Sequence, residues 1–358
     1  MDSDVPTPAP RSGAVAPAKA QGDLRPRPTA DGSPSLWSET FAEGFHSGEG
    51  ALSEALSKFV APAQLERFAP GHLLQVVDVG VGLGYNSAAL LEAARARGLR
   101  LRWWGLELDP RPLGLALADS RYRGLWQADT LALLEQLHQR DHWRSEEAGE
   151  GRWLRGDARQ TLPRLLATAA GSCDLVLHDA FSPGRCPQLW SLEFLGGLAR
   201  LLRPDGRLLT YCSAAAVRQA LLRSGLELAS LGPDAGSPAG PDPADGSPTA
   251  PRHRAPWSLG TAASPAPLPE GGPLRRLSPM ELDHLSTRAA EPYRDPSGQA
   301  EANTILTTRR AAQAAGSGSS TSAWRRRWGL EPGLSPARSA GGTASTPPPA
   351  PAAPPGGG

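Results

Sequence analysis

Residues 73–86 of the chain read LLQVVDVGVGLGYN. The first part, residues 73–80, is a nearly continuous apolar run that ends in glycine, which is typical of a parallel strand buried on both faces. Gly80, Gly82 and Gly84 then occupy alternate positions. Glycines allow a tight turn whose backbone comes close to a ligand and leads into the N-terminus of a helix. The stretch therefore predicts a strand, a ligand-binding turn and a helix in succession.

Strands and helices alternate after this turn. Apolar residues at helical spacing follow it, and further segments of both kinds continue to residue 231. The predicted strands are residues 73–80, 101–109, 152–158, 173–181, 206–213 and 226–231, and the predicted helices are residues 87–98, 111–119, 159–170, 190–202 and 215–225. This alternation predicts an α/β fold, with a parallel sheet and helices on both faces. Ligands of such sheets bind beyond the carboxyl ends of the strands, so the residues that end each strand are candidates for chemistry.

The spacing of the glycines indicates the kind of ligand. A dinucleotide-binding fingerprint is GxGxxG, with its third glycine inside the helix. Gly80, Gly82 and Gly84 instead keep the chain extended. The turn therefore favours a cofactor without a pyrophosphate, such as S-adenosylmethionine.

Acidic residues end the next two strands. Glu107 can accept hydrogen bonds from both hydroxyls of a ribose, while Asp109 is better placed to cap the helix that Pro110 opens. Asp157, between Gly156 and Ala158, can accept a hydrogen bond from an adenine amino group or cap the following helix. The pattern of the sequence leaves both roles open for Asp157.

The fourth strand ends in His178-Asp179-Ala180-Phe181. Asp179 faces the place where substrate and cofactor would meet. A carboxylate there can hold an amine by a charge-assisted hydrogen bond or accept its proton, which makes Asp179 the candidate catalytic residue. His178 alternates away from Asp179 on the strand and is predicted to be a packed core histidine.

Composition divides the chain into folded and low-complexity parts. Gly 40 and Pro 37 make up about a fifth of the 358 residues. Residues 1–34 are predicted to be a disordered tail, residues 232–255 a long exposed loop, and residues 333–358 a second disordered tail. Residues 35–332 remain as one domain, which includes a C-terminal helical extension over residues 277–332 with expected helices at 277–290 and 302–315.

Charge and cysteine content exclude several classes of protein. The formal net charge is +1, so no overall field points to nucleic acid or to a membrane surface. Cys173, Cys186 and Cys212 form no CxxC or zinc-binding pattern, so we expect reduced thiols, no metal and a cytoplasmic location. An apolar run of about 18 residues, as a membrane span needs, is not found in the sequence. We expect a monomer.

Residues 177–228, which begin LHDAFSPGRCPQLW, resemble the methyltransferase domain of the tRNA 5-methylaminomethyl-2-thiouridine biosynthesis protein MnmC. That family has a D-x-F-x-P motif, a loop with a proline, a Leu/Met-Trp pair, a helix, a Pro-x-Gly turn and a strand. The positions that match are Asp179, Phe181, Pro183, Pro187, Leu189, Trp190, Pro204, Gly206 and Ser213. Upstream, DVGVGLGYN is similar to the family's E-x-G-x-G-x-G-x-N, with Asp78 in place of the glutamate, and residues 38–60 look like the family's N-terminal segment.

The resemblance implies a fold, a reaction and a set of site residues. The fold is the Rossmann-like class I S-adenosylmethionine-dependent methyltransferase fold, with a mostly parallel seven-stranded sheet. The reaction is methylation of the amine of 5-aminomethyl(-2-thio)uridine at the wobble position of tRNA. Asp179 would be catalytic, and Phe181 and Arg185 would contact the RNA. The residues implied to bind the cofactor are Asp78, Gly80, Gly82, Gly84, Asn86, Glu107, Asp157 and Ala158.

Further positions bear on what the chain contacts and lacks. Arg325-Arg326-Arg327, between Trp324 and Trp328, is a candidate for phosphate contact, although such a run more commonly lies in a solvated tail. Trp190 is expected to anchor the helix that follows the loop. Two-domain members of the family add a flavin-dependent oxidase, and residues 232–358 are too rich in Pro and Gly to hold one.

Other functions also fit the pattern. A small-molecule N-methyltransferase or an aminopropyltransferase would share the fold, and the latter also places an Asp at the end of the fourth strand. A non-catalytic cofactor-binding or RNA-binding module is the remaining alternative. Retention of the glycines together with Glu107, Asp157 and Asp179 argues against a module that has lost its active site.

Overall fold

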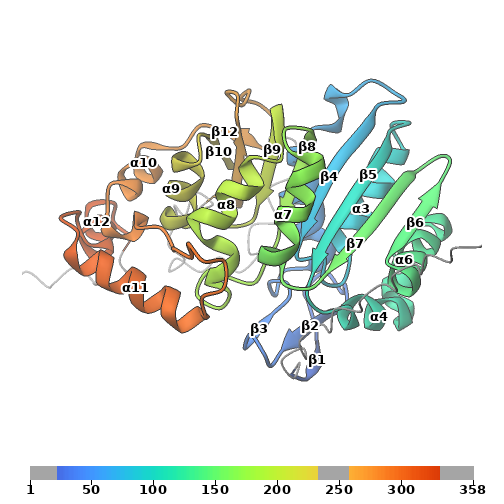
Figure 1. Ribbon diagram of the computed structural model, residues 1–358, viewed down its shortest axis with the longest axis horizontal. Coiled ribbons are helices and arrows are strands. Elements are labelled where there is room, and N and C mark those ends of the chain that lie inside the picture. Colours follow the sequence, from blue (N-terminus) through green and yellow to red (C-terminus); the bar gives the residue numbers. More distant parts are fainter. Residues whose placement is uncertain (1–21, 233–257, 331–358) are drawn as a thin grey trace, which may run out of the picture.

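The computed structural model describes residues 22–232 and 258–330, which form two sheets and the helices around them (Figure 1). The larger sheet has nine strands in the order β12-β10-β11-β9-β8-β4-β5-β7-β6. Its strands are β4 (Leu73–Val79), β5 (Arg100–Glu107), β6 (His142–Ser145), β7 (Gly149–Arg155), β8 (Cys173–His178), β9 (Leu202–Thr210), β10 (Glu227–Leu231), β11 (Gly260–Ser264) and β12 (Leu274–Arg275).

The centre of the large sheet is parallel and its two sides are antiparallel. Strands β9, β8, β4, β5 and β7 pair in parallel, whereas β6, β11, β10 and β12 pair antiparallel to their neighbours. The expectation of seven strands is therefore wrong by two. The hairpin partner β6 and the two-residue strand β12 each add an edge strand. The mostly parallel α/β class is confirmed.

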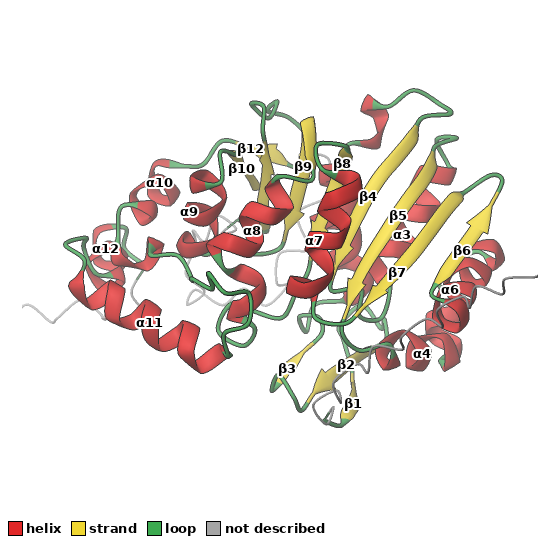
Figure 2. Cartoon of the chain, viewed as in Figure 1, coloured by secondary structure: helices red, strands yellow, loops and turns green. Residues whose placement is uncertain are grey.

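Helices cover both faces of this sheet, as Figure 2 shows. One face packs against α3, α4 and α6 and the other against α7, α8 and α9. Among the described helices, none is long and apolar enough to cross a membrane. The helices of the domain are α1 (Ala51–Glu54), α2 (Ala61–Ala63), α3 (Tyr85–Arg95), α4 (Arg111–Ala118), α5 (Ser120–Arg123), α6 (Ala128–Arg140), α7 (Ala158–Ala169), α8 (Leu192–Ala199), α9 (Ala215–Arg223), α10 (Pro279–Leu285), α11 (Ala302–Ala315) and α12 (Thr321–Arg327).

The apolar run of β4 supplies residues to both cores. Leu74 and Val76 lie in the cluster that includes α3, whereas Val77 and Val79 lie in the cluster that includes α7. All four side chains are fully buried. Since successive side chains of a strand point to opposite faces, a strand with helices on both sides has to be apolar throughout. This burial fixes the position of the strand whose end carries the glycine turn.

The N-terminal residues differ from the prediction of a tail over residues 1–34. Residues 1–21 lie outside the described part, but β1 (Leu24–Arg27) pairs with β2 (Ser35–Ser38), which pairs with β3 (Glu43–Gly44). The turn between β1 and β2 is held by Asp31, whose carboxylate accepts hydrogen bonds from the backbone N–H groups of Ser33 and Ser53. Figure 1 places this small sheet at the carboxyl ends of the central strands.

The C-terminal extension packs against α9. The predicted helix at 302–315 agrees with α11, and the predicted helix at 277–290 divides into α10 and a 3-10 turn, Arg288–Ala290. Arg218 of α9 and Glu281 of α10 form a buried ion pair, with 2.9 Å between Nη1 and Oε1. The run Arg325–Arg327 lies in α12 rather than in a tail.

Several elements were not predicted. Residues 120–148 contain α5, α6 and β6, and β11 inserts between β9 and β10 from a segment after the Pro/Gly-rich stretch. The predicted helix at 190–202 is confined to α8, because Pro187–Trp190 form a 3-10 turn and Leu202 begins β9. The predicted tail at 333–358 and the predicted loop, apart from Gly232, lie outside the described residues.

The buried ion pair between Arg218 and Glu281 allows a stability prediction. Replacing Arg218 with Met should lower the free energy of unfolding by about 3 kcal/mol. Glu281 would keep only the more exposed Arg275 as a cationic partner, and the buried hydroxyl groups of Ser258 and Thr261 would lose their donor. Arg276 and Glu270 form an exposed ion pair, so Arg276→Met should change the same quantity by less than about 1 kcal/mol. Urea unfolding of both variants tests this. Equal effects would show that the buried pair contributes no more than the exposed one.

Candidate active site

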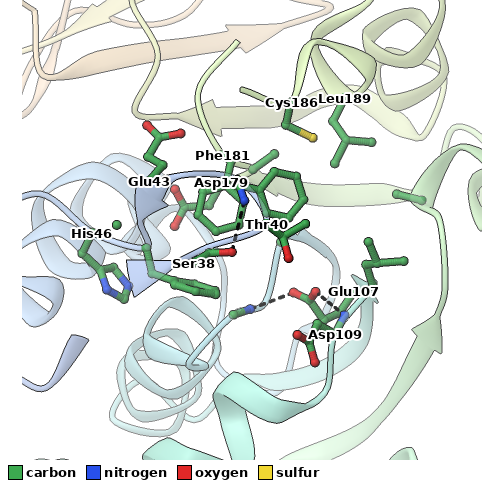
Figure 3. Close-up of a pocket in the computed structure, with 18 of the residues that line it drawn as sticks. Ser38, Thr40, Glu43, His46, Glu107, Asp109, Asp179, Phe181, Cys186 and Leu189 are labelled. Carbon is green, nitrogen blue, oxygen red and sulfur yellow. Dashed lines mark hydrogen bonds between the residues drawn. The ribbon is translucent and has the colours of Figure 1, made fainter. Parts of the chain in front are cut away.

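A cavity of about 430 Å³ opens at the carboxyl ends of β4, β5, β7 and β8, between these strands and the small sheet β1–β3. Figure 3 shows side chains from both sheets pointing into it. Of the residues predicted to form the site, those that line the cavity are Gly80, Gly82, Glu107, Asp157, Ala158, Asp179 and Phe181. The structure thus brings together the ends of four strands that lie far apart in the sequence.

The glycine turn forms the floor of the cavity. Gly80 has φ 81° and Gly82 has φ 54°, both in the left-handed region that side chains disfavour. A Cβ atom on Gly80 would lie 2.7 Å from the carbonyl oxygen of Asp179. The missing side chain therefore lets the end of β4 approach the end of β8.

Glu107 connects the glycine turn to the loop that follows β5. Its Oε2 accepts a hydrogen bond from the backbone N–H of Gly82 at 2.9 Å, and Oε1 accepts one from the N–H of Asp109 at 2.8 Å (Figure 3). Burial raises the pKa of Glu107, although these N–H groups favour the ionised form. Each carboxylate oxygen has a second lone pair, which suits the predicted acceptance of ribose hydroxyls.

Asp157 caps helix α7 and also lines the cavity. Its Oδ1 accepts a hydrogen bond from the backbone N–H of Arg159 at 2.9 Å, and the Arg159 guanidinium pairs with the same carboxylate. The capping role is therefore confirmed. Because Asp157 and Ala158 both border the cavity, the adenine-binding role stays a prediction that the geometry permits.

Three predicted cofactor residues do not line the cavity. Asp78 is fully buried, and its Oδ2 accepts a hydrogen bond from Ser87 Oγ in the first turn of α3 at 2.7 Å. Gly84 is the N-cap of α3, where a Cβ atom would lie 2.9 Å from Leu113. Asn86 donates a hydrogen bond from Nδ2 to Oδ2 of Asp179 at 2.7 Å. All three shape the site from behind its wall.

Asp179 is partly buried at the cavity wall and has a single side-chain hydrogen bond among the described contacts. Burial raises its pKa to about 7, and the nearby carboxylate of Glu54 acts in the same direction. The hydrogen bond from Asn86 and the charge of Lys58 oppose that rise. A carboxyl group with a pKa near neutrality can both accept and release a proton under physiological conditions, as a general base requires.

Phe181 takes part in an aromatic cluster with the N-terminal segment. Its ring stacks on Phe41 with 4.3 Å between centroids and meets Phe45 edge-on at 4.9 Å. It also lines the cavity, so packing and contact with a substrate base are compatible. Arg185 is exposed and lies outside the cavity lining, so its predicted RNA contact remains untested.

His178 and Trp190, on either side of Asp179 in the sequence, have structural roles. His178 is fully buried, its Nε2 lies 2.8 Å from the carbonyl oxygen of Leu189, and burial lowers its pKa to about 4. This confirms the prediction of a core histidine. Trp190 is also fully buried and donates from Nε1 to the carbonyl oxygen of Phe181 at 2.7 Å, which agrees with its expected anchoring role.

The N-terminal segment contributes residues that the sequence analysis did not assign to the site. Glu43 of β3 accepts hydrogen bonds from both N and Oγ of Ser182, at 3.0 and 2.9 Å. Glu54 and Lys58 line the cavity and form an ion pair of 3.0 Å. Lys58 lies in a π-helical turn, Ala55–Val60, a rare conformation that is frequent at functional sites. The likeness of residues 38–60 to the family's N-terminal segment is the sequence feature that could have pointed to these residues.

The cavity has an excess of negative charge. Its lining contains three residues with a permanent positive charge, Arg27, Lys58 and Arg159, and also His46, whose pKa burial lowers to about 4. The acidic lining residues are Glu43, Glu54, Glu107, Asp109, Asp157 and Asp179. This balance favours cationic ligands, such as a sulfonium or an ammonium group. In the described part of the chain, no cluster of His, Cys, Asp and Glu has the arrangement of a metal site.

Comparison with known proteins identifies the domain. Residues 125–236 match the model of a family described as S-adenosyl-L-methionine-dependent methyltransferase. The bifunctional protein MnmC of Azoarcus sp. strain BH72, named for tRNA 5-methylaminomethyl-2-thiouridine biosynthesis, is 34% identical over 209 residues. The crystal structure of MNMC2 from Aquifex aeolicus superposes with a TM-score of 0.64 at 27% identity, covering 83% of this chain and 87% of that chain. This chain carries an MnmC-like methyltransferase domain.

The likeness covers only part of the curated relatives. The Azoarcus match includes 55% of this chain and 32% of the relative, and the MnmC protein of Cupriavidus necator, 34% identical, is matched over 56% and 31%. The chain thus spans about a third of the length of these bifunctional proteins. The family description confirms the predicted cofactor, S-adenosylmethionine, and the Aquifex structure confirms the predicted fold class.

The residues of the MnmC-like domain fit this cofactor. The absence of a Cβ atom at Gly80 lets the glycine turn lie next to the Asp179 backbone at the cavity, and the acidic lining suits a sulfonium cation. Glu107 and Asp157 end neighbouring strands and present carboxylate oxygens at the same side of the cavity, where ribose and adenine could be held.

The close approach at Gly80 leads to a binding prediction. Gly80→Ala should raise the dissociation constant for S-adenosylhomocysteine by roughly tenfold or more, because the new Cβ atom meets the Asp179 backbone and a left-handed alanine is strained. Calorimetric titration measures this.

Gly171→Ala provides the matched control. Gly171 has φ 68°, but no atom lies within 4 Å of its Cβ position. This variant should bear the same backbone strain and bind normally. If both variants lost the ligand equally, the effect would come from global destabilisation and not from the turn.

Proposed function

We propose that the MnmC-like domain transfers a methyl group from S-adenosylmethionine to the amine of 5-aminomethyl(-2-thio)uridine at the wobble position of tRNA. The observation that carries the proposal is the position of Asp179, which borders the same acidic cavity as the glycine turn and is held there by Asn86. The names of the MnmC relatives support the choice of substrate.

The reaction requires a neutral amine. A primary alkylamine is mostly protonated near neutral pH, and its nitrogen then has no lone pair with which to attack. Asp179 would bind the ammonium group by a charge-assisted hydrogen bond and accept its proton. Burial raises the pKa of Asp179 to about 7, so the carboxylate is a stronger base than an exposed one. The cofactor supplies an electrophilic methyl group, while the protein orients the nitrogen toward it.

The part of the cavity around Asp179, where the methyl acceptor would bind, would select a cation attached to a flat ring. Glu43, Glu54 and Asp179 supply negative charge, and Phe181 presents an aromatic surface that can stack on an unstacked base. Glu43 binds Ser182 and thereby holds the loop after Asp179 beneath the small sheet. The acceptor would enter between this sheet and the loop.

The tRNA body would bind outside the cavity. Arg185, exposed on the loop after Phe181, and Arg325 of α12 are candidate phosphate contacts. Arg327 is paired with Asp283 in the same extension. The proposal includes a monomeric enzyme that needs no metal and works in the cytoplasm, where the free thiols of Cys173, Cys186 and Cys212 would stay reduced.

Methyl transfer can be tested directly. The purified chain, S-adenosylmethionine and tRNA containing 5-aminomethyl uridine should yield 5-methylaminomethyl uridine, detected by mass spectrometry of the nucleosides. Asp179→Asn should reduce the rate by roughly 10²–10⁴-fold, because an amide cannot accept the proton, while binding of S-adenosylhomocysteine persists. Free 5-aminomethyl uridine and polyamines serve as alternative acceptors. Faster methylation of those small molecules than of tRNA would contradict the proposal.

The raised pKa of Asp179 predicts a pH dependence. The value of kcat/KM for tRNA should rise with pH to a plateau, with an apparent pKa of about 7, because only the ionised carboxylate accepts a proton. Asn86→Ala removes a donor that stabilises the ionised form, so the apparent pKa should shift to a higher value. Initial rates measured between about pH 5.5 and 9 give the apparent pKa of the unmodified chain and of the Asn86→Ala variant. A profile that Asn86→Ala leaves unmoved would exclude Asp179 as the titrating group.

A further inference from the structure

A segment of the C-terminal extension, residues 293–300, lies against the active site although it follows the large sheet in the sequence. It connects the 3-10 turn at Arg288–Ala290 to helix α11. Helix α11 contacts the 3-10 turn Pro187–Trp190, which lies between β8 and α8. The segment contacts the first turn of α7, where Arg159 lines the cavity, and the first turn of α8.

Arg159 links this segment to the cavity wall. Its Nε and Nη2 donate to the carboxylate of Asp157, with Nη2 2.7 Å from Oδ2. Its Nη1 donates to Asp295 Oδ2 at 2.7 Å and to the carbonyl oxygen of Ala300 at 3.0 Å. The guanidinium is thus shared between a carboxylate that faces the cavity and one from the extension. Its side chain is 13% exposed, so little water competes for these hydrogen bonds.

Asp295 is held rigidly at the other end of this link. It is 1% exposed, and its Oδ1 accepts hydrogen bonds from Ser297 Oγ and from the backbone N–H groups of Gln299 and Ala300. Burial alone would raise the pKa of Asp295, but the hydrogen bonds from Arg159 and Ala300 outweigh it and lower the pKa. A buried carboxylate with this many partners provides a fixed anchor for a cation.

The same segment is also attached to helix α8, which follows the loop after β8. The backbone N–H of Asp295 donates to Glu193 Oε2 at 2.8 Å, and Arg294 forms an ion pair with Glu193 Oε1 at 2.7 Å. The N–H of Leu192 donates to the carbonyl oxygen of Tyr293 at 2.9 Å. Glu193 lies in the first turn of α8, three residues after Trp190, which binds the carbonyl oxygen of Phe181. The segment therefore connects the first turns of α7 and α8, the helices that follow β7 and β8.

We infer that Asp295, acting through Arg159, is a positioning residue for the cofactor: it holds the Asp157 carboxylate at the cavity wall so that the adenosine end of S-adenosylmethionine can bind. This inference rests on the proposed cofactor site but not on the identity of the methyl acceptor. Without Asp295, the guanidinium loses its anchor on the side away from the cavity. Asp157 is then paired with a guanidinium that is no longer fixed in place. The guanidinium of Arg159 can move into the space that would hold the sulfonium, where the two positive charges would repel each other.

Titration with S-adenosylhomocysteine and S-adenosylmethionine tests the inference without any tRNA. Asp295→Asn in the full chain should raise both dissociation constants by about tenfold to a hundredfold, which is the effect of losing a hydrogen bond between charged groups. In an Arg159→Met background, the same substitution should have almost no further effect, because it acts through Arg159. Asp283→Asn, which removes a carboxylate paired with Arg327 in the same extension, should leave both constants unchanged.

Two results would overturn the inference. One is a folded Asp295→Asn variant that binds both ligands as tightly as the unmodified chain. The other is an effect of Asp295→Asn that remains complete in the Arg159→Met background, which would show that Asp295 acts through the general fold. If Asp295→Asn does not fold, Arg159→Lys replaces it, since lysine keeps the charge but cannot bind both carboxylates through separate nitrogens. Unchanged binding by Arg159→Lys would likewise overturn the inference.

The outcome is independent of the proposed reaction. Normal cofactor binding by Asp295→Asn with active methyl transfer contradicts only the positioning role. If the unmodified chain methylates no tRNA but Asp295→Asn still weakens cofactor binding, only the proposed acceptor is contradicted.

Discussion

The contact between the backbone of Gly80 and that of Asp179 is the constraint on which the site depends. Strands β4 and β8 are parallel neighbours, and their ends can meet because a hydrogen atom stands where a Cβ atom would lie 2.7 Å from the Asp179 carbonyl oxygen. This approach brings the turn that would bind the cofactor next to the carboxylate that would receive a proton. Asn86 completes the arrangement, since it lies in the first turn of the helix after the glycine turn and donates to Asp179. One short segment thus forms part of the cofactor site and orients the candidate base.

Two elements outside the alternating strands and helices complete the cavity. The small sheet β1–β3 packs its phenylalanines on Phe181 and binds Ser182 through Glu43, so it closes the acceptor side. The segment before α11 holds Arg159 through Asp295 and so reaches the cofactor side. Both contacts join residues more than 130 positions apart in the chain. A protein with the large sheet alone would have the strand ends but lack the wall formed by the N-terminal segment and the partner that fixes Arg159.

Membership of the glycine motif does not by itself place a residue in the lining of the cavity. Asp78 and Asn86 belong to the glycine motif, but the structure turns both away from the cavity, toward Ser87 and Asp179. A strand residue that precedes the turn by two positions shares its face with Val76 and must point into the helix-covered core. The motif therefore specifies the geometry of the turn, and some of its members act on the cofactor site through other residues.

The sequence by itself determined the central strands, most of the helices around them and the acidic residues at the strand ends. Hydrophobic periodicity and glycine spacing are local properties, and the burial of β4 on both faces follows directly from its composition. The tertiary structure decided which strand ends meet and that Asp157 pairs with Arg159. It also decided that residues 24–60 form a wall of the cavity and that Asp295, from residues 293–300, binds Arg159 behind that cavity. These contacts join segments that are far apart along the chain, and no periodic pattern in either segment records its partner. For the same reason, the two additional edge strands and the pKa of Asp179 could be obtained only from the packed molecule.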